Sequence, residues 1–245
     1  QQYNLPMTFR AAGTSLSGQA VTDGILVDIS KYWDIYSIED DPKHIRFQPG
    51  LVGGFLNNAL KPHRRRIGPD PASIDACMMG GILANNSSGM CCGVTENSYR
   101  TIHSMTFVLP NGFVLDTADP KANQIFENEQ PHIAKGLLEL KQRIVNSTSE
   151  YKGETLAKKI NRRYQMKNNN GYLLNAFLDF NSPLDILTHL LIGSEGTLGF
   201  IAEAVLHTLS DYTYKYTGQM YFKNIRDAAA AIFPIKQSGA RAAEI

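Results

Sequence analysis

Apolar and polar residues follow one another along the chain in two rhythms, which predict short strands mixed with helices. Alternation or short apolar runs predict strands over residues 5–10, 25–29, 104–109, 113–115, 200–209 and 213–222. Helical spacing of apolar residues predicts helices over 51–60, 131–146, 152–162, 184–192 and 225–237. Asn111 and Gly112 between two apolar runs are typical of a hairpin turn. Pro183 after Ser182 is typical of a helix start.

Three segments of small residues interrupt this pattern, at 11–19, 80–93 and 193–199. Small residues allow tight turns and positive φ, and they let backbone N–H groups converge on an anion. Each segment alone is explained equally well as an ordinary turn. Three of them in a chain of 245 residues favour a binding function.

The composition of the chain narrows the classes of ligand that it can bind. Lys and Arg number 24 and Asp and Glu 23, for a net charge of +1, so there is no overall attraction to nucleic acid or anionic lipid. No apolar run approaches the roughly 20 residues of a membrane span. We therefore expect small-molecule chemistry, with no nucleic-acid partner and no membrane span. The 43% hydrophobic content fits one large globular domain or two smaller ones.

The reactive residue types add little. Three cysteines without a Cys-x-x-Cys pair indicate a reduced, intracellular protein without a zinc or iron–sulfur site. The six histidines show no short zinc-binding spacing, so we expect no metal site in this chain. Ser194 lacks the spacing of a nucleophile elbow, which argues against a hydrolase. The start at Gln1, without an initiator methionine, predicts a piece of a longer protein.

Five segments together resemble a known family. Residues 6–19, 68–72, 80–89, 108–112 and 193–200 resemble, in order and spacing, the FAD-binding domain of the FAD-linked oxidases, the vanillyl-alcohol oxidase or PCMH type. Within that family the chain is most similar to D-lactate and other D-2-hydroxyacid dehydrogenases and to the flavin subunit of glycolate oxidase. The resemblance covers residues 5 to about 210.

The resemblance implies an α+β fold with two domains. Residues 1–211 would form a PCMH-type FAD-binding domain of two small mixed sheets with surrounding helices, without the family's N-terminal segment. Residues 212–245 would begin a truncated, ferredoxin-like substrate domain.

The resemblance also implies which residues hold FAD. The loop that begins at Arg10 would bind the pyrophosphate through its backbone amides, and Pro69 and Asp70 would lie along the isoalloxazine. The segment 199–201 would pass the adenosine. The full set is Arg10, Ala11, Ala12, Gly13, Thr14, Ser15, Ser17, Gly18, Gln19, Pro69, Asp70, Gly80, Gly81, Asn85, Ser88, Gly89, Gly93, Gly199, Phe200 and Ile201.

Departures from the family pattern matter as well. Thr14 stands where relatives with covalent flavin carry histidine, so we expect non-covalent FAD. Cys92 stands before Gly93 where many relatives have an aromatic residue, and a reduced pair is favoured over a disulfide between Cys91 and Cys92.

The implied reaction is oxidation of a D-2-hydroxy acid such as D-lactate by hydride transfer to FAD. Electrons would pass to a cytochrome, a quinone or an iron–sulfur module, and any iron–sulfur cluster or metal would lie in the missing part. No catalytic base is identified, and we expect this piece alone to be inactive. The expected location is the cytoplasm, free or peripheral at the inner face of the membrane, and an oligomer is compatible with the sequence.

Two alternatives stay open. Another flavoenzyme of the same fold, such as an alditol oxidase or an alkyl-dihydroxyacetone-phosphate synthase, would share these loops and differ in the second domain. The other alternative is a non-catalytic piece that folds without binding FAD.

Overall fold

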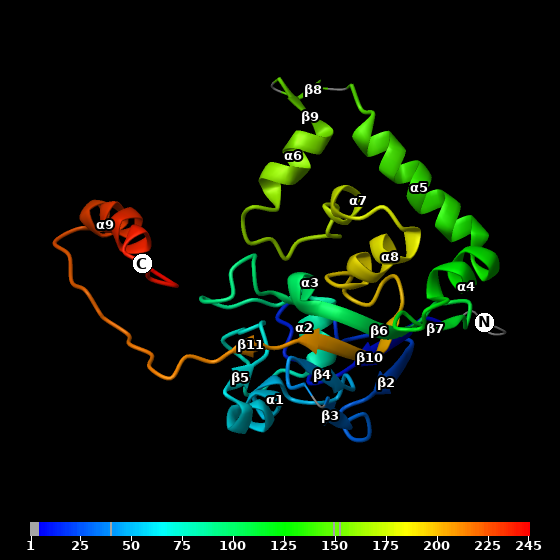
Figure 1. Ribbon diagram of the computed structural model, residues 1–245, viewed down its shortest axis with the longest axis horizontal. Helices are drawn as coiled ribbons and strands as arrows, with labels where there is room; N and C mark the ends of the chain where they lie inside the picture. Colours follow the sequence, from blue (N-terminus) through cyan, green and yellow to red (C-terminus); the bar gives the residue numbers. More distant parts are fainter. Residues whose placement is uncertain (1–4, 40, 149, 152) are drawn as a thin grey trace.

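A five-stranded antiparallel sheet forms the centre of the protein. The computed structural model describes residues 5–39, 41–148, 150–151 and 153–245. The strands lie in the order β3–β4–β10–β6–β7. Their bounds are β3 (Tyr36–Ile38), β4 (His44–Phe47), β10 (Phe200–His207), β6 (Ile102–Val108) and β7 (Val114–Asp116). The long strand β10 therefore lies in the middle of the sheet, between β4 and β6, which both precede it in the sequence (Figure 1).

The two faces of this sheet differ in polarity. Ile45 and Phe47 of β4 lie opposite Leu206 and Ala204 of β10, and all four are buried. The alternate positions carry His44 and Arg46 on β4, which lie opposite His207 and the buried, apolar Val205 of β10. One face thus packs into the core, and the other carries charged and imidazole side chains.

Helices cover the sheet in two groups. Helix α1 (Gly53–Leu60), turn η1 (Lys61–His63), α2 (Met79–Ala84) and α3 (Ser98–Thr101) lie close to the sheet, and β5 (Arg65–Arg66) pairs with β11 (Leu209–Ser210). The second group is α4 (Ala122–Glu129), α5 (Pro131–Val145), α6 (Leu156–Arg163), α7 (Ala176–Asp179) and α8 (Pro183–Leu191), above the sheet in Figure 1. The pair β8 (Glu150–Tyr151) and β9 (Glu154–Thr155) lies between α5 and α6.

Helix α8 shows how local sequence sets a boundary. The Ser182 hydroxyl accepts a hydrogen bond from the Asp185 amide, and Pro183 occupies the first turn, where its missing N–H costs nothing. Most of the helix is buried, including Leu187 and Leu191. The predicted cap is therefore confirmed, and tertiary packing holds the helix in place.

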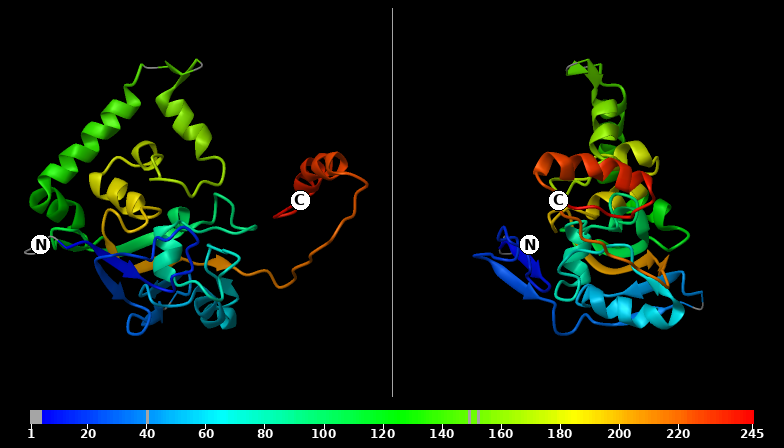
Figure 2. Two further views of the ribbon diagram at one scale, coloured as in Figure 1. Left: turned by 180° about the vertical axis from the view of Figure 1, so that it is seen from behind. Right: turned by 90° about the vertical axis from the view of Figure 1, so that its left-hand side faces the viewer.

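The strands β1 (Met7–Arg10) and β2 (Ile25–Asp28) form a separate parallel pair. Its apolar side chains remain largely open: Met7 is 55% exposed and Ile25 43%. The pair stands beside the central sheet (Figure 2, right-hand view). It carries the first segment of small residues as its connecting loop.

The C-terminal part projects from this body and contacts it through an ion pair between Arg241 and Glu96. After β11 the chain runs out as an extended segment to α9 (Ile225–Gln237), which has no buried residue (Figure 1). The helix over 225–237 is confirmed, but the strand predicted over 213–222 is wrong. A strand needs a hydrogen-bonded neighbour, and none lies beside this segment in the described residues.

The remaining element predictions are largely confirmed. The strands predicted up to residue 115, the helices over 51–60, 131–146 and 184–192, and the strand from Phe200 all occur within a few residues of their predicted bounds. Residue 152, the first of the predicted helix over 152–162, lies outside the described residues, and α6 begins at Leu156. The α+β class is confirmed. In the described part of the chain, no helix has the length and apolar character needed to cross a membrane.

Candidate functional site

The first predicted loop connects β1 to β2 and depends on two glycines with positive φ. Gly13 has φ of +66° and Gly18 of +79°, a region that side-chain-bearing residues rarely adopt. A Cβ on Gly13 would lie 2.7 Å from Nε of Arg10, so the guanidinium lies directly over this turn. The Ser15 hydroxyl donates to the Gln19 side-chain oxygen. The loop is thus folded on itself, with a cation at its base.

Two adjacent glycines of the second segment have different surroundings. The Gly80 amide donates to the Pro49 carbonyl at 2.8 Å, and a Cβ here would lie 2.9 Å from Pro49 Cβ. A Cβ on Gly81 would meet nothing within 4 Å. Gly80 is therefore required by packing within the protein, whereas Gly81 faces open space at the surface of α2.

Asp70 holds the end of the same segment through backbone amides. Its Oδ1 accepts hydrogen bonds from the amides of Gly89 at 2.8 Å and Cys92 at 3.2 Å, and its Oδ2 accepts one from Cys91 at 2.9 Å. A Cβ on Gly89 would lie 1.7 Å from the Asp70 carbonyl oxygen. Two predicted site residues, Asp70 and Gly89, thus contact one another and position the loop.

The two adjacent cysteines beside Asp70 are free thiols. Cys91 is exposed and Cys92 is buried. Burial, followed by the neighbouring Asp70 carboxylate, raises the pKa of the Cys92 thiol to about 11. Cys92 is therefore protonated at neutral pH and is a poor nucleophile.

The third segment of small residues, 193–199, is hydrogen-bonded to the C-terminal end of α2. The Gly193 amide donates to the Leu83 carbonyl at 3.0 Å, and the Glu195 amide donates to the Ala84 carbonyl at 2.9 Å. These bonds satisfy carbonyls that the short helix leaves without intrahelical partners. Residues 193–195 are thereby held against the segment that contains Gly81.

Aromatic stacking connects the β1–β2 pair to the central sheet. The rings of Phe9 and Phe200 stack with centroids 4.1 Å apart, and Trp33 meets Phe200 edge-on at 4.9 Å. Gly199 is needed for packing, because a Cβ there would lie 2.9 Å from the Val108 carbonyl oxygen. Ile201 is buried in β10.

These contacts bring the second and third segments together at α2 and place the β1–β2 pair beside them. Ile29, just after β2, lies 3.7 Å from the position of a Gly80 Cβ, residues 193–195 bond to the end of α2, and Phe200 stacks on β1. Asn85 donates its side-chain amide to Ser87 at 2.8 Å. The assignment of each predicted residue to a part of FAD stays a prediction.

One cation near these loops was not predicted from the sequence. The Lys167 ammonium, in the segment 164–175, donates to the carbonyl of Ser88 in the second segment of small residues. Its position in the sequence, within an unpatterned polar stretch, gave no signal. Lys167 and Arg10 place one positive charge at each of two predicted loops.

The open glycines fit a ligand that approaches the backbone closely. No atom lies within 4 Å of the position that a Cβ would take at Gly18, Gly81 or Gly93. At Gly80, Gly89 and Gly199, by contrast, protein atoms already occupy the space next to that position. Free backbone approach together with cations suits a ligand with phosphate groups. The residues present therefore fit FAD.

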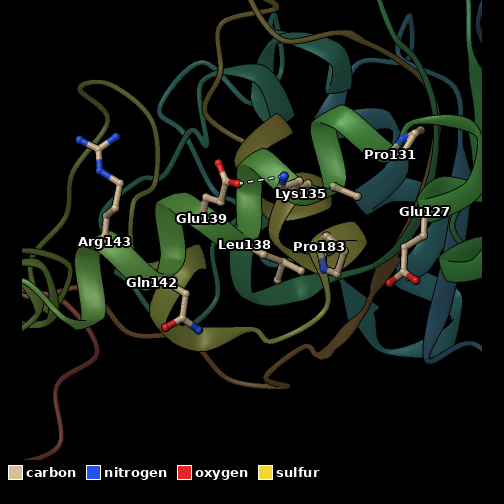
Figure 3. A pocket seen from close by; sticks show the side chains of 9 residues that line it. Glu127, Pro131, Lys135, Leu138, Glu139, Gln142, Arg143 and Pro183 are labelled. Carbon is tan, nitrogen blue, oxygen red and sulfur yellow. Dashed lines mark ion pairs between the residues drawn. The ribbon is translucent and has the colours of Figure 1, made fainter.

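A surface groove lies elsewhere and lacks such features. It has a volume of about 690 Å³ and is lined by α4, α5 and Pro183, with Lys135 and Glu139 paired at 3.7 Å (Figure 3). None of the predicted FAD residues lines it. Its side chains include no cluster of polar groups aimed at one point, so it does not compete with the glycine loops as a cofactor site.

Comparison with known proteins identifies a FAD-binding domain in this chain. Residues 1–118 match the family model described as FAD binding domain. The chain is 31% identical over 214 residues to D-2-hydroxyglutarate dehydrogenase of Haemophilus influenzae, covering 84% of this chain and 20% of that protein. It is 26% identical over 247 residues to the mitochondrial D-lactate dehydrogenase (cytochrome) 1 of Saccharomyces cerevisiae, covering 96% and 31%.

A shorter match joins residues of this chain to another flavin subunit. Over 107 residues the chain is 34% identical to the glycolate oxidase subunit GlcD of Escherichia coli, covering 42% of this chain and 21% of that one. The chain spans about a fifth to a third of the length of these curated relatives.

Solved structures share the fold. An alkyldihydroxyacetonephosphate synthase superposes with a TM-score of 0.56 at 19% identity, covering 97% of this chain and 34% of that chain. FAD is the cofactor that the matched domain binds. On these sequence matches, the chain belongs to the family of proteins that carry this FAD-binding domain.

Proposed function

We propose that residues 1–211 form the flavin-binding domain of a dehydrogenase that oxidises a D-2-hydroxy acid. The observation that carries this proposal is the extent of the match. Similarity to D-2-hydroxyglutarate dehydrogenases extends over 83% to 91% of the chain, well beyond the part that the FAD-domain model covers. D-2-hydroxyglutarate, D-lactate and glycolate are the substrate candidates that the relatives' names supply.

The chain's own residues bind and orient the cofactor. Gly18, Gly81 and Gly93 leave the backbone open, so that its N–H groups can approach the ligand. Arg10 at the first loop and Lys167, which contacts the second loop at Ser88, would balance phosphate charge. Thr14 cannot form a histidyl bond to the flavin, so we expect FAD to be bound non-covalently. When bound, FAD supplies the acceptor for the hydride that leaves the α-carbon of the hydroxy acid.

The remaining chemistry belongs to a second domain, which we propose begins at residue 212. Helix α9 exposes Ile225 and Phe233, at 72% and 68%, as an element that packs in such a domain would. There we place the catalytic base and the substrate carboxylate site. Electrons then pass to a cytochrome, a quinone or an iron–sulfur module.

Two experiments test the proposal at its two levels. The chain is mixed with excess FAD and desalted, and retained absorption near ~450 nm is expected for protein-held flavin. A colourless product contradicts the cofactor assignment for this chain.

The substrate class is tested on the complete protein. D-2-hydroxyglutarate, D-lactate and glycolate are added anaerobically, with the L-enantiomers of the first two as matched controls. We expect a D-2-hydroxy acid to bleach the flavin band and its L-enantiomer to leave it unchanged. Bound flavin that no 2-hydroxy acid reduces would contradict the dehydrogenase proposal and favour a synthase or another oxidase of this fold.

A further inference from the structure

Three histidines meet on the polar face of the central sheet. His44 comes from β4, His103 from β6 and His207 from β10, and one nitrogen of each lies within 4.8 Å of the others. The ring centroids are 4.5 to 4.9 Å apart. His44 Nε2 lies 3.0 Å from His207 Nδ1. None of the three belongs to the predicted flavin site.

Strand register explains the cluster. Strand β10 lies between β4 and β6, and His44 lies directly opposite His207 in the antiparallel pair. On the other side, Val205 pairs with Ser104 but Leu206 pairs with Ile102, so His103 is the extra residue of a bulge. Bulges redirect a side chain. The fold therefore brings the third ring to the other two.

We propose that His44, His103 and His207 bind a late first-row divalent cation, with Zn²⁺ the ion that fits best. Tetrahedral zinc with Zn–N bonds of about 2.0–2.1 Å requires roughly 3.3 Å between ligand nitrogens. The separations in the cluster bracket this value, at 3.0 Å for one pair and no more than 4.8 Å for any. Small side-chain rotations suffice. Three imidazoles leave a fourth position open for water or another ligand.

A carboxylate orients one of these ligands. Glu39 Oε2 lies 3.6 Å from Nδ1 of His44, which leaves Nε2 of that ring directed at the cluster. Carboxylate–histidine pairs of this kind fix the ring and its tautomer in zinc sites. Glu39 is therefore a positioning residue.

A nearby cation does not oppose a metal at the cluster. Arg46, the nearby cation, is paired with Glu203. The hydrogen bond between His44 and His207 accounts for two rings but gives no reason for the third to lie against both.

The proposal departs from the sequence-based expectation of no metal site in this chain. That expectation rested on short spacings, whereas these ligands come from three strands that are distant in sequence. A bound ion would join β4, β6 and β10 where the chain leaves the sheet for β11. It would stabilise the sheet independently of flavin.

Zn²⁺ titration of the tag-free, chelator-treated chain tests the site. Calorimetry is expected to show one equivalent of Zn²⁺ bound and a raised melting temperature, while Mg²⁺, which prefers oxygen ligands, has no effect. The variant His103→Gln is expected to lose affinity, and Glu39→Gln is expected to weaken it by about 10–100-fold. His132→Gln, on α5 away from the cluster, is the matched control and keeps full affinity.

A second readout does not depend on folding of the variants. Co²⁺ bound to the unmodified chain is expected to show the visible bands of a four-coordinate nitrogen site, and Zn²⁺ is expected to remove them. The proposal is overturned if the unmodified chain binds no Zn²⁺, or if His103→Gln and His132→Gln bind it equally well.

Discussion

The two sheets that meet at Phe200 are built from similar apolar strands, yet they are buried to very different degrees. In the central sheet Phe47 is 1% exposed and Phe107 is fully buried. In the β1–β2 pair Phe9 is 41% exposed and Leu26 44%. An apolar strand pattern therefore predicts a strand, but neighbouring elements decide whether it enters a core.

This difference in burial assigns stability and ligand binding to different parts of the molecule. The central sheet and its helices hold the fold, whereas the loosely covered β1–β2 pair carries the loop with Gly13 and Gly18. Segments with few buried contacts open at low free-energy cost. Flavin that binds only the ordered loop would stabilise this region by mass action.

The largest effect is expected in the central sheet. Phe107→Ala removes a fully buried ring from β6 and leaves a cavity, which should cost about 3–5 kcal/mol of unfolding free energy. Urea unfolding measures it, with Phe107→Leu as the milder control. A loss no larger than that for an exposed phenylalanine would show that the central sheet is not the stable part.

A smaller loss is expected from Asp70→Ala. Three backbone amides lose a charged acceptor, which should cost roughly 2–3 kcal/mol, since the loop can recover some bonds to water. Asp70→Asn keeps the shape and one acceptor oxygen and should lose less. The Cys92 thiol should also titrate at lower pH in either variant, because the neighbouring negative charge is gone. Unchanged stability in Asp70→Ala would contradict the positioning role.

Lowering the pH is expected to reduce the unfolding free energy of the protein. Burial, the largest cause in each case, lowers the pKa of His103, His189 and His207 below about 6.5, so the unfolded chain takes up these protons first. This stability is present above about pH 6.5 and is lost as pH falls through the lowered pKa values.

Urea unfolding at several pH values measures this dependence. His189→Phe keeps a ring beside Phe180, whose centroid lies 3.8 Å from that of His189, and should flatten the profile. His132→Phe is the control at an exposed position on α5. Stability that rises as pH falls below about 6.5 would contradict the lowered pKa values of the three histidines.

The smallest loss of stability is expected in the β1–β2 pair. Phe9→Ala removes the stack on Phe200 from a half-open position, which should cost about 0.5–1.5 kcal/mol. The same change should weaken FAD binding, because the loop after Arg10 loses its anchor. Phe9→Leu retains apolar contact and serves as the control. A global loss as large as that of Phe107→Ala would remove the distinction between the two sheets.

Local signals predicted most of the fold. The cap at Ser182, the turn at Gly112 and the spacing within α5 each depend on neighbours in sequence, and each is confirmed. Strands β3 and β4 were not predicted because they are only three and four residues long. The prediction of a strand over 213–222 was wrong because the pattern of a segment does not show whether another strand lies beside it to form hydrogen bonds.

The sequence predicts the candidate site only as separate segments, and the contacts that these segments make come from the structure. Sequence grouped Gly80 with Gly81, although Pro49 packs against the first and the second is open. Lys167 and the three clustered histidines gave no signal, since folding alone brings them to their neighbours. Resemblance identified the loops, while tertiary contacts separate residues that pack from residues that are free to bind.

The most direct test of the account compares FAD binding and stability in Gly81→Ala. A Cβ at Gly81 meets no protein atom within 4 Å, and alanine favours a helix by up to about 1 kcal/mol over glycine, so the variant should unfold at the same or a higher urea concentration. FAD fluorescence quenching should nevertheless show clearly weaker binding than in the unmodified chain. Unchanged FAD affinity in a fully folded Gly81→Ala variant would contradict the placement of the cofactor on α2.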